Sequence, residues 1–237
     1  LVFLVFLVLI VMIYANNHSS IHQRQLEYYN EHYIVDDTNN TTEPILRKQL
    51  RNRTLSHEVF GYHPYWMGTA WQYYDFDMIS TLAFFSVEAT ATGGFSDLHG
   101  WPSISLINEA HSHGTNVVLC VSLFSNSDIV TLLSNEQYRQ NMIDNLLDQV
   151  KLANADGVNV DFESFPTSQK ENMVTFITDL TDTFHNEIPG SQVTIAMPAV
   201  DWVDAFDYNS LASISDGLFI MGYDYHWSGS EKTGAVS

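Results

Sequence analysis

Six short apolar runs, separated by longer segments of helical period, constrain the fold of this 237-residue chain more than any other feature. The runs span residues 59–62, 78–87, 116–123, 157–162, 192–197 and 217–223. Strand–helix alternation of this kind predicts a parallel β-sheet covered by helices. Behind the fourth run, one apolar helical stripe is formed by Met173, Phe176, Ile177, Leu180, Phe184 and Ile188.

Two α/β architectures use this alternation, an open doubly wound sheet and a closed eight-stranded barrel. The first run is not followed by a Gly-x-Gly-x-x-Gly turn, which argues against a dinucleotide-binding sheet. Two helix starts are predicted from capping boxes, Ser134 with Gln137 and Ser168 with Glu171.

The N-terminal part of the chain differs in composition from the rest. Residues 1–13 are all Leu, Val, Phe, Ile or Met, so 1–15 is interpreted as a signal peptide or membrane anchor whose start is missing. Residues 16–56 are polar and are predicted to be a linker or stalk with short helices near 21–33 and 44–53. We therefore expect a protein that is secreted or anchored on the outer side of the membrane.

The charge is strongly acidic, with 9 Lys and Arg against 28 Asp and Glu, and the excess belongs entirely to residues 57–237. Such a surface repels phosphate backbones, which argues against nucleic acid as a partner. The single cysteine, Cys120, excludes an internal disulfide framework and is interpreted as a buried thiol.

The segment Asp-Gly-Val-Asn-Val-Asp-Phe-Glu at 156–163 carries the chemistry. Alternate side chains of a strand share a face, so three apolar residues should face the helices and three polar residues the barrel interior. The first set is Val158, Val160 and Phe162, and the second is Asn159, Asp161 and Glu163. Two neighbouring buried carboxylates cannot both ionise cheaply, and a carboxyl group that keeps its proton suits a general acid for glycosidic cleavage.

This segment resembles the Asp-Gly-x-x-x-Asp-x-Glu signature of glycoside hydrolase family 18, the chitinase family. Residues 221–224, Met-Gly-Tyr-Asp, resemble that family's sixth-strand motif, while 61–66 and 196–198 resemble its first and fifth strands. The resemblance covers residues 57–237 and implies a TIM (β/α)8 barrel, here incomplete with about six parallel strands.

The family's last two strand–helix units are then absent, and we expect a gap between the first and sixth strands. Because each of these two strands would present an unpaired apolar edge, we expect the 237-residue piece to be poorly soluble and inactive when it is expressed alone.

The resemblance also implies roles for individual residues. Glu163 would be the general acid, Asp161 would accept the acetamido N–H of the substrate, and Tyr223 would hold its carbonyl oxygen. The substrate's own acetamido oxygen would be the nucleophile in a retaining mechanism that needs neither metal nor cofactor. The substrate-binding residues implied are Tyr62, Phe85, Asn159, Met197, Met221, Asp224 and Trp227.

Asn159 and Phe162 stand where many members of the family have Asp and Trp, a variant that resembles the spore-cortex and germination-type branch. The expected substrate is thus a β-1,4-linked N-acetylglucosamine polysaccharide, either chitin-like or peptidoglycan-like. Two alternatives stay open: a non-catalytic carbohydrate-binding protein, and an ordinary retaining glycosidase with Asp224 as its second carboxylate.

Other candidate sites are weaker. His111 and His113 end a predicted helix, and we interpret them as residues of a helix C-terminus rather than a metal pair. Ser122 lacks a convincing His and Asp pattern, which argues against serine hydrolysis. Five tryptophans follow strands or lie in loops, where an indole can stack on a sugar face or equally well pack in the core or anchor its loop: Trp66, Trp71, Trp101, Trp202 and Trp227.

Overall fold

The computed structural model describes residues 19–32, 55–223, 226 and 234. It contains two compact units, which are described separately: Ile34–Gly222, and a smaller unit made of Leu1–Tyr33 with Tyr223–Ser237. The predicted leader at 1–15 and most of the predicted linker at 16–56 lie outside the described residues. Within the described part of the chain, no helix combines the length and the hydropathy that crossing a membrane requires.

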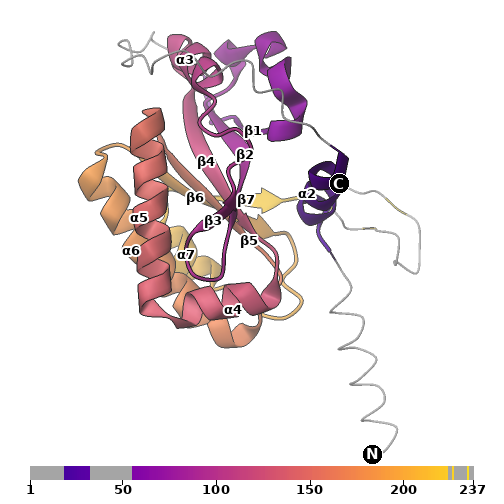
Figure 1. The fold of residues 1–237 in the computed structure, drawn as a ribbon, viewed down its shortest axis with the longest axis vertical. Coiled ribbons are helices and arrows are strands. Elements are labelled where there is room, and N and C mark those ends of the chain that lie inside the picture. The colour runs from indigo at the N-terminus through magenta and orange to yellow at the C-terminus, as the bar shows by residue number, and fades with distance from the viewer. Residues whose placement is uncertain (1–18, 33–54, 224–225, 227–233, 235–237) are drawn as a thin grey trace, which may run out of the picture. The chain divides into compact units, whose positions relative to one another are not determined.

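The larger unit is built on one curled sheet of six parallel strands, which confirms the predicted incomplete barrel (Figure 1). The strands lie in the order β1-β2-β4-β5-β6-β7. Their bounds are β1 Phe60–Pro64, β2 Thr81–Ala89, β4 Asn116–Leu123, β5 Gly157–Phe162, β6 Gln192–Pro198 and β7 Gly217–Met221. A seventh strand, β3 (Phe95–Asp97), pairs antiparallel with the end of β2 and was not expected from the sequence.

The two end strands of this path, β1 and β7, face each other across the inside of the curled sheet. The ring of Phe219 in β7 lies 5.5 Å from Phe60 and 4.9 Å from Tyr62 in β1, measured between ring centroids. Among the described residues the two strands share no backbone ladder. The predicted gap between the first and sixth strands is therefore confirmed.

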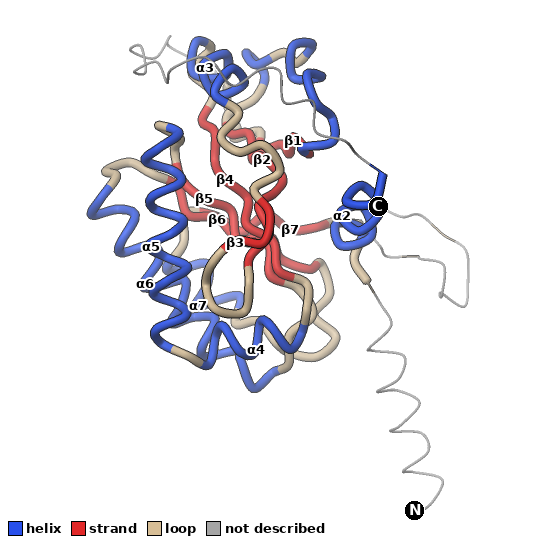
Figure 2. The backbone as a smooth tube through the Cα atoms, viewed as in Figure 1, coloured by secondary structure: helices blue, strands red, loops and turns tan. Residues whose placement is uncertain are grey.

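Helices follow the strands and cover the outer face of the sheet, as the colouring by secondary structure shows (Figure 2). Helices α5 and α6 lie side by side there (Figure 1). The α-helices of this unit are α3 Ile104–Ser112, α4 Asn126–Ser134, α5 Glu136–Ala153, α6 Lys170–Glu187 and α7 Tyr208–Ile214, and the 3-10 helices are η1 Tyr65–Tyr73, η2 Phe76–Met78 and η3 Thr167–Gln169.

Both capping-box predictions were wrong. Helix α5 is capped by Asn135, whose side chain accepts the backbone N–H of Tyr138, because Ser134 is still the last residue of α4. Ser168 lies inside η3, and α6 begins only after Gln169. In both cases the serine that was expected to cap the long helix belongs instead to a short helix just before it.

The amino ends of three strand pairs are held by the same pair of hydrogen bonds, which we call backbone bridges. In each bridge, a residue at the start of the first strand donates its backbone N–H to the side chain of the residue just before the second strand. The backbone N–H of the latter residue donates in return to the backbone carbonyl of the former. The bridges join Ser80 with Val59, Asp156 with Val117 and Asp216 with Val193, so they connect β1–β2, β4–β5 and β6–β7.

Two of the backbone bridges receive a histidine from the helix that precedes the first strand of the pair. His111 Nε2 lies 2.7 Å from Asp156 Oδ2, and His185 Nε2 lies 3.0 Å from Asp216 Oδ2. His111 thus has a structural partner at the amino ends of the strands, which supports the interpretation of this residue as part of a helix C-terminus.

The smaller unit contains α2 (Ile21–His32), which confirms the short helix expected near 21–33; the one expected near 44–53 lies outside the described residues. In this unit the hydroxyl of Tyr223 lies 2.5 Å from His22 Nε2, and their ring centroids are 5.6 Å apart.

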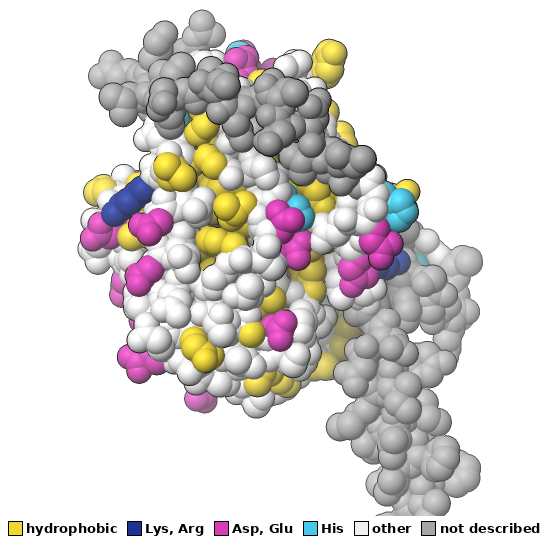
Figure 3. All heavy atoms as spheres, in the orientation of Figure 1, with side chains coloured by type: hydrophobic (Ala, Val, Ile, Leu, Met, Phe, Trp, Pro, Cys, Tyr) yellow, Lys and Arg dark blue, Asp and Glu magenta, His cyan; other side chains and the backbone are white. Residues whose placement is uncertain are grey.

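The surface agrees with the acidic composition. On the face shown in Figure 3, Asp and Glu side chains are scattered over the described surface and Lys and Arg are sparse.

Candidate active site

Strand β5 places the three polar residues of the signature in a row, as the alternation predicted. Asn159 and Asp161 are fully buried, and Glu163, the first residue after β5, is 7% exposed. On the opposite face, the ring of Phe162 is stacked on Phe176 of α6, with centroids 5.7 Å apart. The apolar face of β5 therefore packs on a helix, and the polar face is left for the interior of the curled sheet.

Asn159 is fixed by hydrogen bonds from three other strands. Its side-chain oxygen accepts the hydroxyl of Tyr62 at 3.0 Å and the thiol of Cys120 at 3.4 Å. Its side-chain nitrogen donates to Thr194 Oγ1 at 2.9 Å. A neutral amide, which both accepts and donates, suits this set of partners better than a carboxylate does. The network ties β1, β4 and β6 to the middle of β5.

The pKa of the Cys120 thiol responds to the burial and the negative charges of the site. Burial raises the pKa of its thiol well above the ordinary value, and the negative charges of Asp161 and Glu163 raise the pKa further. Because the thiolate is the reactive form, this residue is not a nucleophile. The prediction of a buried inert thiol is confirmed.

Aromatic rings form a wall beside Asn159. Tyr62 lies 6.1 Å from Phe85 between ring centroids, and Phe85 lies 5.7 Å from Trp66, both in edge-to-face geometry. Phe219 completes the wall at Tyr62. Phe219 was not predicted from the sequence, although it stands two residues before Met221 in a predicted strand and therefore shares its face.

The two predicted methionines lie on different faces. Met221 ends β7 on the same face as Phe219 and is 5% exposed. Met197 in β6 is fully buried, and strand alternation places it on the face opposite to Thr194, the partner of Asn159. The structure therefore brings together Tyr62, Phe85, Asn159 and Met221 on one face, and Met197 does not join them.

The remaining predicted residues lie at the end of the chain. Tyr223 follows β7 by two positions and is described within the smaller unit. Asp224 and Trp227 lie outside the described residues.

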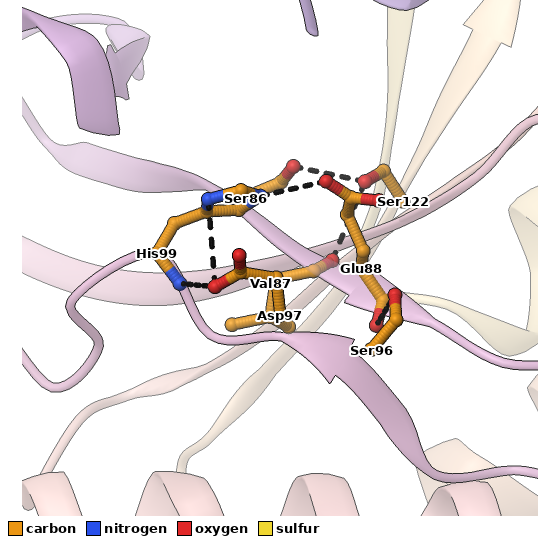
Figure 4. Close-up of polar contacts among 7 residues, drawn as sticks. All are labelled: Ser86, Val87, Glu88, Ser96, Asp97, His99 and Ser122. Atoms are coloured by element: carbon orange, nitrogen blue, oxygen red, sulfur yellow. Dashed lines mark hydrogen bonds and ion pairs between the residues drawn. The ribbon is translucent and has the colours of Figure 1, made fainter. Parts of the chain in front are cut away.

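A second polar cluster lies at the carboxyl ends of β2 and β4 (Figure 4). The hydroxyls of Ser86 and Ser122 are 2.9 Å apart, and Ser122 also donates to the carbonyl of Val87. Next to them, His99 Nε2 lies 2.7 Å from Glu88 Oε1, and the His99 ring is stacked on Tyr65 with centroids 3.9 Å apart. Because Ser122 is paired with a serine, this cluster does not form a Ser-His-Asp arrangement.

Among the described residues of the larger unit, no three His, Cys, Asp or Glu side chains gather their ligand atoms at one point.

The buried carboxylates lie at the carboxyl end of β5, the fourth parallel strand of the curled sheet, which is the end where (β/α)8 barrels build their sites. Residues 58–237 match the sequence profile of glycosyl hydrolases family 18, and the chain belongs to that family.

Individual relatives agree with this assignment. The chain is 31% identical over 113 residues to the Bacillus subtilis protein described as sporulation-specific glycosylase YdhD, covering 46% of this chain and 26% of the relative. It is 31% identical over 163 residues to human di-N-acetylchitobiase, covering 65% of this chain and 37% of the relative. The chain thus spans well under half the length of these curated relatives.

Among solved structures, the fold is similar to catalytic domain 2 of the Ostrinia furnacalis Group II chitinase, with a TM-score of 0.68 and 18% identity over 76% of this chain and 54% of that one. It is also similar to the spore cortex-lytic enzyme SleL of Bacillus cereus, with a TM-score of 0.64 and 19% identity over 76% and 44%.

Proposed function

We propose that this protein is a glycosidase that hydrolyses β-1,4-linked N-acetylglucosamine polysaccharides. The observation that carries the proposal is the placement of Glu163 directly after β5, on the face that also carries the fully buried Asp161. Glu163 retains 7% exposure, so one carboxyl group can reach a ligand from an otherwise enclosed position. Family membership supports this chemistry.

In the proposed mechanism, Glu163 protonates the leaving glycosidic oxygen while the acetamido oxygen of the substrate attacks its own anomeric carbon. Asp161 accepts the acetamido N–H and stabilises the positive charge that develops on the ring. Water, activated by the ionised Glu163, then opens the oxazolinium intermediate with retention of configuration. Because the nucleophile belongs to the substrate and is held in place, no second enzyme carboxylate is required.

The aromatic wall of Tyr62 and Phe85 is the proposed contact surface for the reacting sugar, together with Met221. We assign Tyr223 to the acetamido carbonyl, and Asp224 and Trp227 to further substrate contacts, on the strength of the motif at 221–224. The side-chain amide of Asn159 holds Tyr62 in place by accepting a hydrogen bond from its hydroxyl.

The substrate is chitin-like or peptidoglycan-like. The similarity to sporulation-specific and spore cortex-lytic proteins favours a peptidoglycan-like polymer, whereas the similarity to a chitobiase and a chitinase favours chitin-like oligomers. The apolar run at 1–13 supports export of the protein, to the medium or to the outer side of the membrane.

A non-catalytic carbohydrate-binding protein is the second candidate, because an aromatic wall alone is enough to bind a sugar. The presence of Glu163 at the strand end favours the enzyme.

Replacement of Glu163 by Gln tests the proposal. We expect kcat on a fluorogenic N-acetylglucosamine oligomer to fall by at least about 10²-fold in the full-length protein, because an amide cannot protonate the leaving oxygen. Binding of the oligomer should persist, since the two side chains have nearly the same size.

Glu171→Gln, in the first turn of α6, is the matched control and should leave kcat unchanged. An E163Q protein with near-normal kcat would refute the role of Glu163. A wild-type protein that binds the oligomer without cleaving it would support the second candidate. Cleavage of a plain glucose polymer at a comparable rate would favour a two-carboxylate mechanism.

A further inference from the structure

The loop between β6 and α7 exposes a large aromatic side chain. Trp202 is 88% exposed, and its neighbours Val200 and Val203 are 43% and 48% exposed. The loop follows the carboxyl end of β6, whereas Glu163 follows the carboxyl end of the adjacent β5. In parallel barrels this end of the sheet carries the ligand-binding loops.

The loop is held in a defined shape by its own hydrogen bonds. The carboxylate of Asp201 accepts the backbone N–H groups of Val203, at 3.3 Å, and of Phe206, at 2.8 Å. At the neck of the loop, the hydroxyl of Tyr208 donates to the carbonyl of Pro198. Trp202 therefore projects from an ordered turn, and ordering this segment on binding a ligand costs little entropy.

Three contacts also fasten this loop to the segment that begins at Glu163. Thr167 donates its hydroxyl to the carbonyl of Val203, and Lys170 pairs with Asp204. Below them, the rings of Phe165 and Phe206 meet edge to face, with centroids 4.7 Å apart. Both phenylalanines are buried, at 1% and 6% exposure, so the two loops share a small apolar core.

We propose that Trp202 is a stacking platform for a sugar unit of the polysaccharide other than the one being cleaved, an inference that rests on the proposed function. A pyranose ring presents a face of C–H groups, and an exposed indole on a fixed turn offers a flat apolar surface for it. Charge supports a neutral occupant: Lys170, which reaches this loop, is already paired with Asp204, and the chain carries a net charge of −19. Anionic lipid heads and nucleic acid are repelled from such a surface.

The experiment compares hydrolysis of short and long N-acetylglucosamine oligomers by the full-length protein. Trp202→Ala should lower kcat/KM on the long oligomers by about 2- to 12-fold, the range expected for loss of one aromatic stacking contact. On a fluorogenic disaccharide that does not extend to the platform it should leave kcat/KM unchanged. Trp202→Phe, which keeps a ring, should retain most of the activity on long oligomers.

Leu152→Ala is the matched control, because Leu152 is 62% exposed and lies near the end of α5, away from the carboxyl ends of the strands. The control should leave kcat/KM unchanged on both the short and the long oligomers. Neither the control nor Trp202→Ala should shift the thermal midpoint of unfolding.

Equal losses on short and long oligomers, or no loss on either, would overturn the platform. The proposal would also be overturned if the wild-type protein forms oligomers or binds neutral lipid vesicles and Trp202→Ala does not. The indole would then contact a second copy of the chain or a membrane. If the wild-type protein cleaves none of the oligomers, the proposed function fails and the platform with it. If cleavage is normal and Trp202→Ala has no length-dependent effect, the platform alone fails.

Discussion

Gly157, the second residue of the signature, is a position where a single methyl group should be destructive. Its φ is +146°, a backbone conformation that residues with a side chain rarely adopt. A Cβ built on it would lie 1.9 Å from the carbonyl oxygen of Gln192 and 2.6 Å from its backbone nitrogen. Backbone atoms of a paired strand cannot move aside as a flexible side chain can, so β5 and β6 would have to separate locally.

The cost of Gly157→Ala can be worked out from these contacts. A strained backbone conformation contributes about 1–3 kcal/mol. Loss of the 2.8 Å hydrogen bond from Gln192 N to the carbonyl of Asp156 adds about 0.5–1.5 kcal/mol. We therefore expect the free energy of unfolding to fall by about 1.5–4.5 kcal/mol.

Urea unfolding of the full-length protein, followed by circular dichroism, measures this loss. Alanine substitutions at two other glycines separate the effect of backbone strain from the effect of the new Cβ contacts. Gly190→Ala has φ of +86° but nothing within 4 Å of the new Cβ, so it tests backbone strain alone. Gly217→Ala, at the equivalent position of β7, meets only Thr194 Cγ2 at 3.6 Å and should be mild. A Gly157→Ala protein within about 0.5 kcal/mol of Gly217→Ala would refute the reasoning.

Two further predictions concern buried polar residues. Burial lowers the pKa of His63 from 6.5 to about 4. Between these pH values only the unfolded chain takes up the proton, so the free energy of unfolding should fall by up to about 3 kcal/mol as the pH drops from 6.5 to 4. His63→Gln should flatten this dependence in urea titrations, and an unchanged pH dependence would contradict the assignment. Asn159→Asp should lower the free energy of unfolding by about 1–3 kcal/mol at pH 7, because a carboxylate cannot donate to Thr194. Protonation of the new group should recover part of this loss at pH 4.5, whereas an equal loss at both pH values would argue against a buried charge.

The strands and their phase could be predicted because both faces of a parallel barrel strand are buried. Such strands appear as continuous apolar runs, and a polar residue within one stands out. Within 157–162 that reasoning placed Phe162 toward a helix and Asn159 and Asp161 toward the interior, and the structure agrees on all three.

What the sequence did not predict depends on register and on the length of neighbouring elements. The partners of Asn159 lie 35 to 97 residues away in the chain, so Cys120 and Thr194 could be identified only once the strands were aligned. The three residues of β3 are too few to show a period. The exposure of Trp202 depends on the bonds that Asp201 makes within its loop, and composition does not reveal them.

The backbone bridges have a consequence for how this barrel tolerates change. Their partners are 21, 39 and 23 residues apart, so each bridge closes within one strand–helix–strand unit. In these three of the five neighbouring parallel pairs, alignment is therefore fixed at the amino end by contacts within the pair. The loops at the opposite end, including those that carry Glu163 and Trp202, take no part in this alignment. A change in the length or sequence of these loops should therefore leave the three bridges intact, so that substrate preference can diverge while the bridged strands keep their register.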